Sequence, residues 1–239
     1  MTQIIAICNH KGGIGKTATS CSLAAALQQK GKQVLVIDLD GQANLTESLG
    51  LSIEEEETIY GAMCGKHPLP LIELSNGITI VPSCLDLSAA ESELISEPGR
   101  ELILKGLITK ALAIKPFDYV LIDCPPSLGL LTLNALTAAD YVIIPVQAQY
   151  LPAKGLEQLL QTINKVRRQI NPKLRIEGIL LTMVDSRTNY SKDISNLIRE
   201  NYGGKLKVYK TDIPRSVRAE EISAEGTSIF KHDPKGKVA

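Results

Sequence analysis

The stretch that decides the fold reads Ile4-Ile5-Ala6-Ile7-Cys8-Asn9-His10-Lys11-Gly12-Gly13-Ile14-Gly15-Lys16-Thr17. Its apolar first five residues predict a buried strand, and the glycines predict a tight turn before a helix that opens at Thr17. Backbone N–H groups in such a turn point toward a phosphate chain, and the amino end of the helix adds partial positive charge. The stretch therefore predicts a phosphate-binding loop at residues 11–17.

Two side chains of this loop narrow the ligand class. Lys16 supplies a formal charge for the outer phosphates, and the Thr17 hydroxyl is a ligand that suits Mg²⁺. The pattern predicts a nucleoside triphosphate bound with magnesium. The loop also has a second lysine, Lys11, where the usual spacing has its first glycine.

Carboxylates follow two further predicted strands. Asp38 ends the run Val34–Asp38 and Asp40 comes two residues later. Ligands of open α/β sheets collect at such strand ends, so one carboxylate could orient a water on the γ-phosphate or hold metal-bound water. The alternative is a turn or a helix cap, because turns favour aspartate; it is as good an explanation for Asp38 but a weaker one for Asp40. The run Tyr119–Asp123 ends in the aspartate expected of a Walker B strand, which binds Mg²⁺ directly or through water.

Apolar, β-branched runs alternate with helical patterns, which predicts an α/β fold with a mostly parallel sheet covered on both faces. A shorter strand is expected near Val208, an amphipathic helix over about 153–170, and a surface excursion over 51–77. We expect one domain, residues 1–239. The predicted strands are Ile4–Cys8, Val34–Asp38, Ile78–Pro82, Tyr119–Asp123, Tyr141–Pro145 and Glu177–Thr182.

Composition excludes several other classes of protein. Hydrophobic residues make up 44% and charged residues 22%, as in globular proteins, and no run is apolar for the length of a membrane span. The five cysteines are odd in number and form no C-x-x-C pair, which favours a reducing, cytoplasmic compartment. The three histidines have no zinc spacing and indicate no hydrolase triad.

The net charge of zero conceals an asymmetry. Residues 1–162 contain 10 basic and 17 acidic side chains, whereas residues 163–239 contain 16 basic and 9 acidic ones. A basic C-terminal third is a candidate surface for a polyanion, although a solvated face balanced by acidic neighbours has the same composition.

The motifs together resemble the ParA/MinD group of ATPases with a deviant Walker A loop, and within it most closely the ParA/Soj partition ATPases. The resemblance covers nearly the whole chain, in order. The matching segments are 11–17, 36–40, 121–126, Pro145-Val146-Gln147, Gly155-Leu156, 182–189 and 213–218.

The resemblance implies that ATP and Mg²⁺ are the cofactors and that two subunits sandwich two ATP molecules. Lys11 would then be the signature lysine that reaches the partner's phosphates, and Asp40 would position the attacking water. Thr17, Asp40 and Asp123 would surround the metal, and Pro214 and Ser216 would contact adenine. The remaining nucleotide-binding residues would be Gly12, Gly13, Ile14, Gly15, Lys16 and Ala18.

The resemblance also implies non-specific DNA binding by the ATP-bound homodimer on the nucleoid, and weak hydrolysis stimulated by a ParB-type partner, with no membrane involved. Arg187 and Arg218 match positions that contact DNA in the family, and Lys192, Arg199 and Arg215 lie nearby in sequence, although Arg215 could instead serve the nucleotide. Two alternatives remain: a MinD-like membrane regulator of cell division, and a non-catalytic ATP-dependent regulator of a mobile element.

Three departures from the family pattern stand out. Ala18 follows Thr17 where a second threonine is common, which predicts a weaker phosphate contact. Gly41 stands where proline is frequent, which predicts a looser loop after Asp40. The chain ends at Ala239, where relatives usually continue into a final helix, so we expect that helix to be absent.

Overall fold

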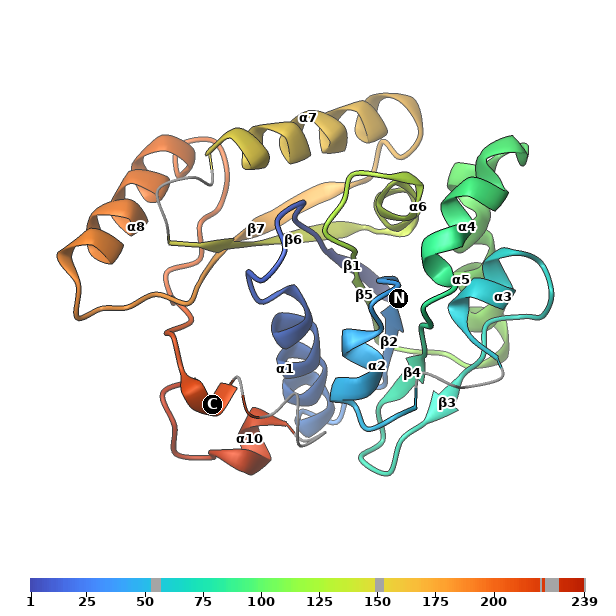
Figure 1. Ribbon diagram of the computed structural model, residues 1–239, viewed down its shortest axis with the longest axis horizontal. Helices are drawn as coiled ribbons and strands as arrows, with labels where there is room; N and C mark the ends of the chain where they lie inside the picture. Colours follow the sequence, from blue (N-terminus) through green and yellow to red (C-terminus); the bar gives the residue numbers. More distant parts are fainter. Residues whose placement is uncertain (53–56, 149–152, 220, 222–227, 239) are drawn as a thin grey trace.

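A computed structural model of the protein describes residues 1–52, 57–148, 153–219, 221 and 228–238. Its seven-stranded sheet has the order β3-β4-β2-β5-β1-β6-β7, and β3 runs antiparallel to β4 while the other neighbours are parallel (Figure 1). The strands are β1 (Gln3–Ile7), β2 (Val34–Asp38), β3 (Ile72–Glu73), β4 (Thr79–Val81), β5 (Tyr119–Asp123), β6 (Tyr141–Gln147) and β7 (Arg175–Thr182).

Helices connect and cover these strands. The α-helices are α1 (Lys16–Gln29), α2 (Asn44–Ser48), α3 (Ile59–Met63), α4 (Leu87–Glu93), α5 (Ile103–Ile114), α6 (Leu130–Ala138), α7 (Ala153–Gln169), α8 (Asn189–Tyr202) and α10 (Ile229–His232). Two short 3₁₀ turns are η1 (Leu94–Ser96) and η2 (Arg100–Leu102).

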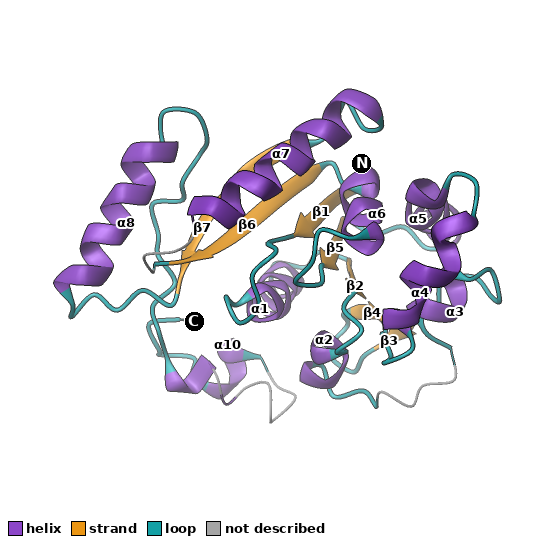
Figure 2. Ribbon diagram, turned by 45° about the horizontal axis from the view of Figure 1, so that its top comes forward, coloured by secondary structure: helices purple, strands orange, loops and turns teal. Residues whose placement is uncertain are grey.

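The two faces of the sheet bury different side chains of the same strands, because neighbouring residues of a strand point to opposite faces. Ile5 and Ile7 of β1 pack on one face with Cys21 and Ala24 of α1. The alternate β1 residue Ala6 belongs to the larger cluster on the other face, together with residues of α4 to α7. Figure 2 shows α7 and α6 on the side of the sheet opposite α1.

The strand order positions the site. β1 lies between β5 and β6. After β1 the chain crosses to β2 on one side of the sheet, and after β5 it crosses to β6 on the other side, so the strand order reverses at the carboxyl end of β1. The register places Ile7 beside Asp123 and Asp123 beside Asp38. The ends of β1, β5 and β2 therefore form one edge, which receives the phosphate-binding loop and both buried aspartates.

The predicted α/β fold is confirmed, with differences at the ends of elements. All six predicted strands are present: β2 and β5 have the predicted bounds, and the other four differ by one or two residues at their ends. The predicted helix over 153–170 is α7. The strand expected near Val208 is a single parallel bridge to Ile179. The excursion over 51–77 contains α3 and the two-residue strand β3, which the sequence analysis missed.

Candidate functional site

The phosphate-binding loop leaves β1 and enters α1 through two glycines with left-handed backbone. Gly13 has φ 68° and Gly15 has φ 83°, a conformation that L side chains rarely adopt. A Cβ on Gly13 would meet nothing within 4 Å, so Gly13 is needed for its dihedral angle and not for space. The Thr182 hydroxyl at the end of β7 donates to the Ile14 carbonyl over 2.8 Å and fastens the middle of the loop to the sheet.

Lys16 begins α1, one residue earlier than predicted, and its side chain is buried. The ammonium group donates to the Lys11 carbonyl over 3.0 Å, so it lies across its own loop. The first turn of α1 has neither a side-chain cap nor an acidic residue, which leaves its N–H groups available to an anion. Loop, lysine and helix end together form a phosphate site.

Lys11 is held through its backbone, since its N–H donates to the Asn9 side chain over 3.2 Å. Within the described residues no hydrogen bond or ion pair engages its ammonium group. The side chain of Lys11 is only partly buried, unlike that of Lys16.

Asp123 is buried at the carboxyl end of β5, and its carboxylate accepts hydrogen bonds from two hydroxyl groups of α1. Thr17 donates to one carboxylate oxygen over 2.7 Å and Ser20 donates to the other over 3.0 Å. Burial, and next the charge of Asp38, raises the pKa of Asp123 to about 7. Ser20 was missed by the sequence analysis, although it lies one helical turn after Lys16, on the same face of α1.

Asp38 and Asp40 have different environments. Asp38 is fully buried; it accepts the Thr46 N–H over 2.8 Å and the Thr46 hydroxyl over 2.7 Å, and so holds the start of α2. Burial raises the pKa of Asp38 to about 6. The carboxylate of Asp40 is partly exposed and accepts the Gln42 N–H over 3.1 Å. The turn and capping role left open by the sequence is therefore seen at both residues, and Asp40 is the less buried of the two.

The metal donors of this edge are few. The described residues contain no group of three or more His, Cys, Asp and Glu side chains that could hold an ion. The Thr17 hydroxyl and the Asp123 carboxylate are hard oxygen donors already in contact, and they suit an ion that keeps several waters and phosphate oxygens. This donor set fits Mg²⁺ better than zinc.

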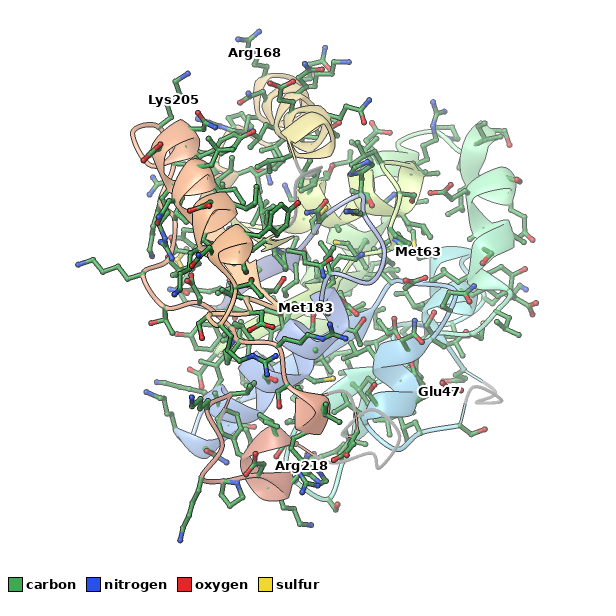
Figure 3. All side chains as sticks on the ribbon, turned by 60° about the vertical axis from the view of Figure 1, so that its left-hand side comes forward. Glu47, Met63, Arg168, Met183, Lys205 and Arg218 are labelled. Atoms are coloured by element: carbon green, nitrogen blue, oxygen red, sulfur yellow. The ribbon has the colours of Figure 1, made fainter. Side chains whose placement is uncertain are left out.

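A cavity of about 390 Å³ extends from the phosphate-binding loop past α1 to the C-terminal segment. Pro214, Arg215 and Ser216 line it, as does Ala18 of α1. The adenine contact of Pro214 and Ser216 stays a prediction. Met183 also lines the cavity. Its φ of 53° lies in the left-handed region, where a residue other than glycine is strained. In Figure 3 the Met183 label lies at the centre of the molecule, over α1.

The predicted DNA-binding residues do not form one group. Arg187 pairs with Asp185 through two hydrogen bonds of 2.9 and 2.8 Å, while its side chain remains 87% exposed. Hydrogen bonds from Arg187, with a smaller charge effect of Arg215, lower the pKa of Asp185 to about 2. Lys192 is exposed in the first turn of α8. Arg187, Lys192 and Arg215 are called the basic surface below.

Arg199 and Arg218 bind other parts of the chain than the basic surface. The Arg199 guanidinium donates to the Tyr209 carbonyl over 2.7 Å and also binds Asp212, which fastens α8 to the segment after it. Arg218 pairs with Glu221 over 3.1 Å. Figure 3 shows Arg218 beside the C-terminal segment, and Lys205 and Arg168 at the other end of the view. The basic C-terminal third is therefore distributed over several surfaces.

Comparison with known proteins decides the family. A model described as an AAA domain matches residues 2–176. The chain is 43% identical to the sporulation initiation inhibitor protein Soj of Bacillus subtilis, over 100% of this chain and 94% of Soj. It is 39% identical to the chromosome partitioning protein ParA of Caulobacter vibrioides, over 98% of this chain and 88% of that protein. The chain belongs to the ParA/Soj family of P-loop ATPases.

A solved structure supports the nucleotide and magnesium expected for this ParA/Soj family member. A Mycobacterium smegmatis protein described as cobyrinic acid a,c-diamide synthase, with bound ADP and magnesium, superposes with a TM-score of 0.85. It is 38% identical, over 99% of this chain and 97% of that one. In the described part of the chain, no helix combines the length and the apolar character that crossing a bilayer requires.

Proposed function

We propose that this chain is a Mg²⁺-dependent ATPase that dimerises around ATP, binds DNA without sequence preference and partitions plasmid or chromosomal DNA with a ParB-type partner. Residues 1–239 would act as one ATPase domain, in the cytoplasm and on the nucleoid. The observation that carries the proposal is the contact of Thr17 with the buried Asp123, next to a phosphate-binding loop that has two lysines. Family membership supports the partition role.

Each residue of the site has a role in this proposal. The amides of residues 12–17 and the Lys16 ammonium group hold the phosphates, and Ala18 and Ser216 lie toward the base. Thr17 and Asp123, with Asp40 near the outer shell, would hold Mg²⁺. When bound, the ion neutralises charge on the phosphate oxygens. Asp40 orients the attacking water, because a carboxylate on a partly exposed residue can accept a hydrogen bond from that water.

Lys11 is assigned to the partner's nucleotide. Lys11 is partly exposed, and Lys16 already supplies the positive charge next to the phosphate-binding loop of its own subunit. A lysine from a second subunit would place positive charge where negative charge develops during phosphoryl transfer. Hydrolysis would therefore depend on dimerisation, and we expect it to be weak until the partner protein stimulates it.

DNA binding is assigned first to the basic surface. Arg187 and Lys192 are exposed, and phosphate contacts of such side chains give affinity that is independent of sequence and sensitive to salt. Arg218 is also exposed and extends the interface toward the C-terminal segment. Arg199 is assigned a structural role, since its guanidinium is engaged within the fold.

The test uses Lys11→Ala. ATP binding, followed by the thermal shift that ATP·Mg²⁺ produces, should remain within about threefold of wild type, because Lys16 and the loop amides are intact. The ATP-dependent dimer should be lost in gel filtration, and hydrolysis should fall with it. Lys32→Ala, at an exposed position after α1, serves as the control. A variant that dimerises and hydrolyses ATP normally would contradict the assignment.

A sedimentation assay separates the alternatives. Wild-type protein with ATP·Mg²⁺ should co-sediment with DNA and not with anionic vesicles, and ADP should abolish the effect. Sedimentation with the vesicles alone would favour the MinD-like regulator. Sedimentation with DNA that persists without any measurable hydrolysis would favour the non-catalytic regulator.

A further inference from the structure

Helix α4 contacts the loop that carries Asp40, here called the Asp40 loop (residues 39–43). A Cβ added to Gly41 would lie 2.3 Å from the Ser88 hydroxyl oxygen and 3.1 Å from the Ser88 nitrogen. Gly41 is buried and its φ is not positive, so glycine is needed there for the close approach of α4. The expectation of a loose loop at Gly41 is therefore not what the packing shows.

The segment that leads into α4 also binds the Asp40 loop. The Ser83 hydroxyl donates to the Asp40 carbonyl over 2.8 Å, and the Ser83 N–H donates to the Thr46 hydroxyl over 2.9 Å. Thr46 in turn donates to Asp38. Ser83 is fully buried, so this chain of hydrogen bonds is shielded from water.

The same helix contacts the loop after Asp123, here called the Asp123 loop (residues 124–129). Glu91 accepts the backbone N–H of Leu131, in the first turn of α6, over 3.0 Å. The residue before α6 is Gly129, which has no side chain to cap the helix, and a Cβ there would lie 2.3 Å from Glu91. Glu91 therefore caps α6 from another element, and its negative charge suits the amino end of that helix.

The contacts of α4 with the two loops come from one side of one short helix. Ser88 and Glu91 are three residues apart and so are neighbours on the helix surface. The adjacent face is anchored, since Leu87, Ala90 and Leu94 are buried in the larger core cluster. The Asp123 loop also approaches the phosphate-binding loop, because a Cβ on Gly12 would lie 3.9 Å from Pro126.

We propose that Glu91 is a positioning residue, and that α4 couples the Asp123 loop to the Asp40 loop so that both respond together to the bound nucleotide. The inference rests on the proposed ATPase function. Glu91 acts through α6 and α4 and not on the nucleotide itself, so it affects the rate of hydrolysis more than ATP affinity.

The primary variant is Glu91→Ala, with Glu93→Ala as a matched control. Glu93 lies on the same helix but binds Tyr60 of α3 and Cys64 just after α3, away from both loops. Glu91→Ala should lower kcat for ATP about tenfold, as expected from losing one charge-assisted hydrogen bond that orders the site, and leave KM within about threefold. Glu93→Ala should leave kcat unchanged. Glu91→Gln, which keeps an acceptor oxygen, should restore most of the rate.

Hydrogen exchange supplies a readout that does not require turnover. In wild type, ATP·Mg²⁺ should protect amides of both loops, and in Glu91→Ala the protection should persist in the phosphate-binding loop but disappear over 40–46. Equal protection there in the variant, or equal kinetic effects of Glu91→Ala and Glu93→Ala, would overturn the coupling. If wild type binds ATP without hydrolysing it, the proposed function fails, and the exchange pattern still decides the coupling.

A second pair of variants tests the other end of α4 and guards against a folding defect of Glu91→Ala. Gly41→Ala should lower kcat, because its Cβ would meet the Ser88 hydroxyl. Adding Ser88→Ala removes that oxygen and should recover part of the rate. A double variant no better than Gly41→Ala, together with a normal rate for Glu91→Ala, would leave α4 without a coupling role.

Discussion

The phosphate end of the site and the basic surface differ in how their charged groups are held. Lys16, Asp38 and Asp123 are buried and engaged by backbone or hydroxyl partners from neighbouring elements. Arg187 and Lys192 are exposed, and the contact that restrains Arg187 comes from Asp185, two residues away. A buried charge must have partners, whereas an exposed one need not. Substitutions should therefore have large, specific effects in the first region and graded, salt-dependent effects in the second.

The largest effect is expected for Lys16→Ala. It removes the buried charge beside the phosphates, so ATP affinity should fall by about a hundredfold or more. Isothermal titration with ATP·Mg²⁺ measures this, and Lys30→Ala, exposed after the end of the same helix, is the control. Affinity that survives unchanged would refute the assignment of the loop.

Asp40→Ala should come next. ATP binding should persist while hydrolysis falls by about a hundredfold, the scale of losing a general base. Gel filtration should then show a dimer trapped with ATP. Glu47→Ala, exposed on α2 and labelled in Figure 3, is a nearby acidic control. A variant that stays monomeric with ATP would remove Asp40 from the proposed role.

Arg187→Glu tests the second region. DNA affinity at moderate salt should fall about tenfold, and the slope of log affinity against log salt should become shallower by about one for each DNA phosphate that the protein no longer neutralises. ATP affinity should not change. Arg168→Glu, exposed near the end of α7, is a control of the same charge change. An equal decrease of DNA affinity in both variants would mean that net charge, and not the basic surface, sets the affinity.

The smallest effect is expected for Asp123→Asn in the nucleotide-free protein. The folded state raises the pKa of this carboxyl to about 7 from 3.8, so the ionised form is disfavoured by folding. Stability of the wild type is therefore lost as pH rises through this window. Asn should raise Tm by a few degrees at pH 8, and by less at pH 5. A larger gain at pH 5 would contradict the sign of the shift.

The sequence predicted the first region better than the second for a physical reason. A phosphate-binding loop depends on local dihedral angles at Gly13 and Gly15 and on strand order, both of which leave a sequence signature. The engagement of Arg199 by Tyr209 and Asp212 depends on how α8 packs, which charge counting does not contain. Partners that lie far along the chain, such as Thr182 for Ile14 and Glu91 for Leu131, likewise have no local signal.

Some errors of the fold prediction have the same origin. β3 is two residues long and exists through its pairing with β4, so no period of two could reveal it. The segment around Val208 is apolar enough for a strand, yet it contributes one bridge to Ile179 at the edge beyond β7. The central strands were predicted well because their burial on both faces makes them continuously apolar.

The close approach of Gly41 to Ser88 has an evolutionary consequence. Two positions forty-seven residues apart share one small volume, so neither can gain atoms alone. Homologues with proline at the first position should carry a smaller residue at the second, or an α4 displaced outward. Such paired replacement should appear as covariation between the two alignment columns.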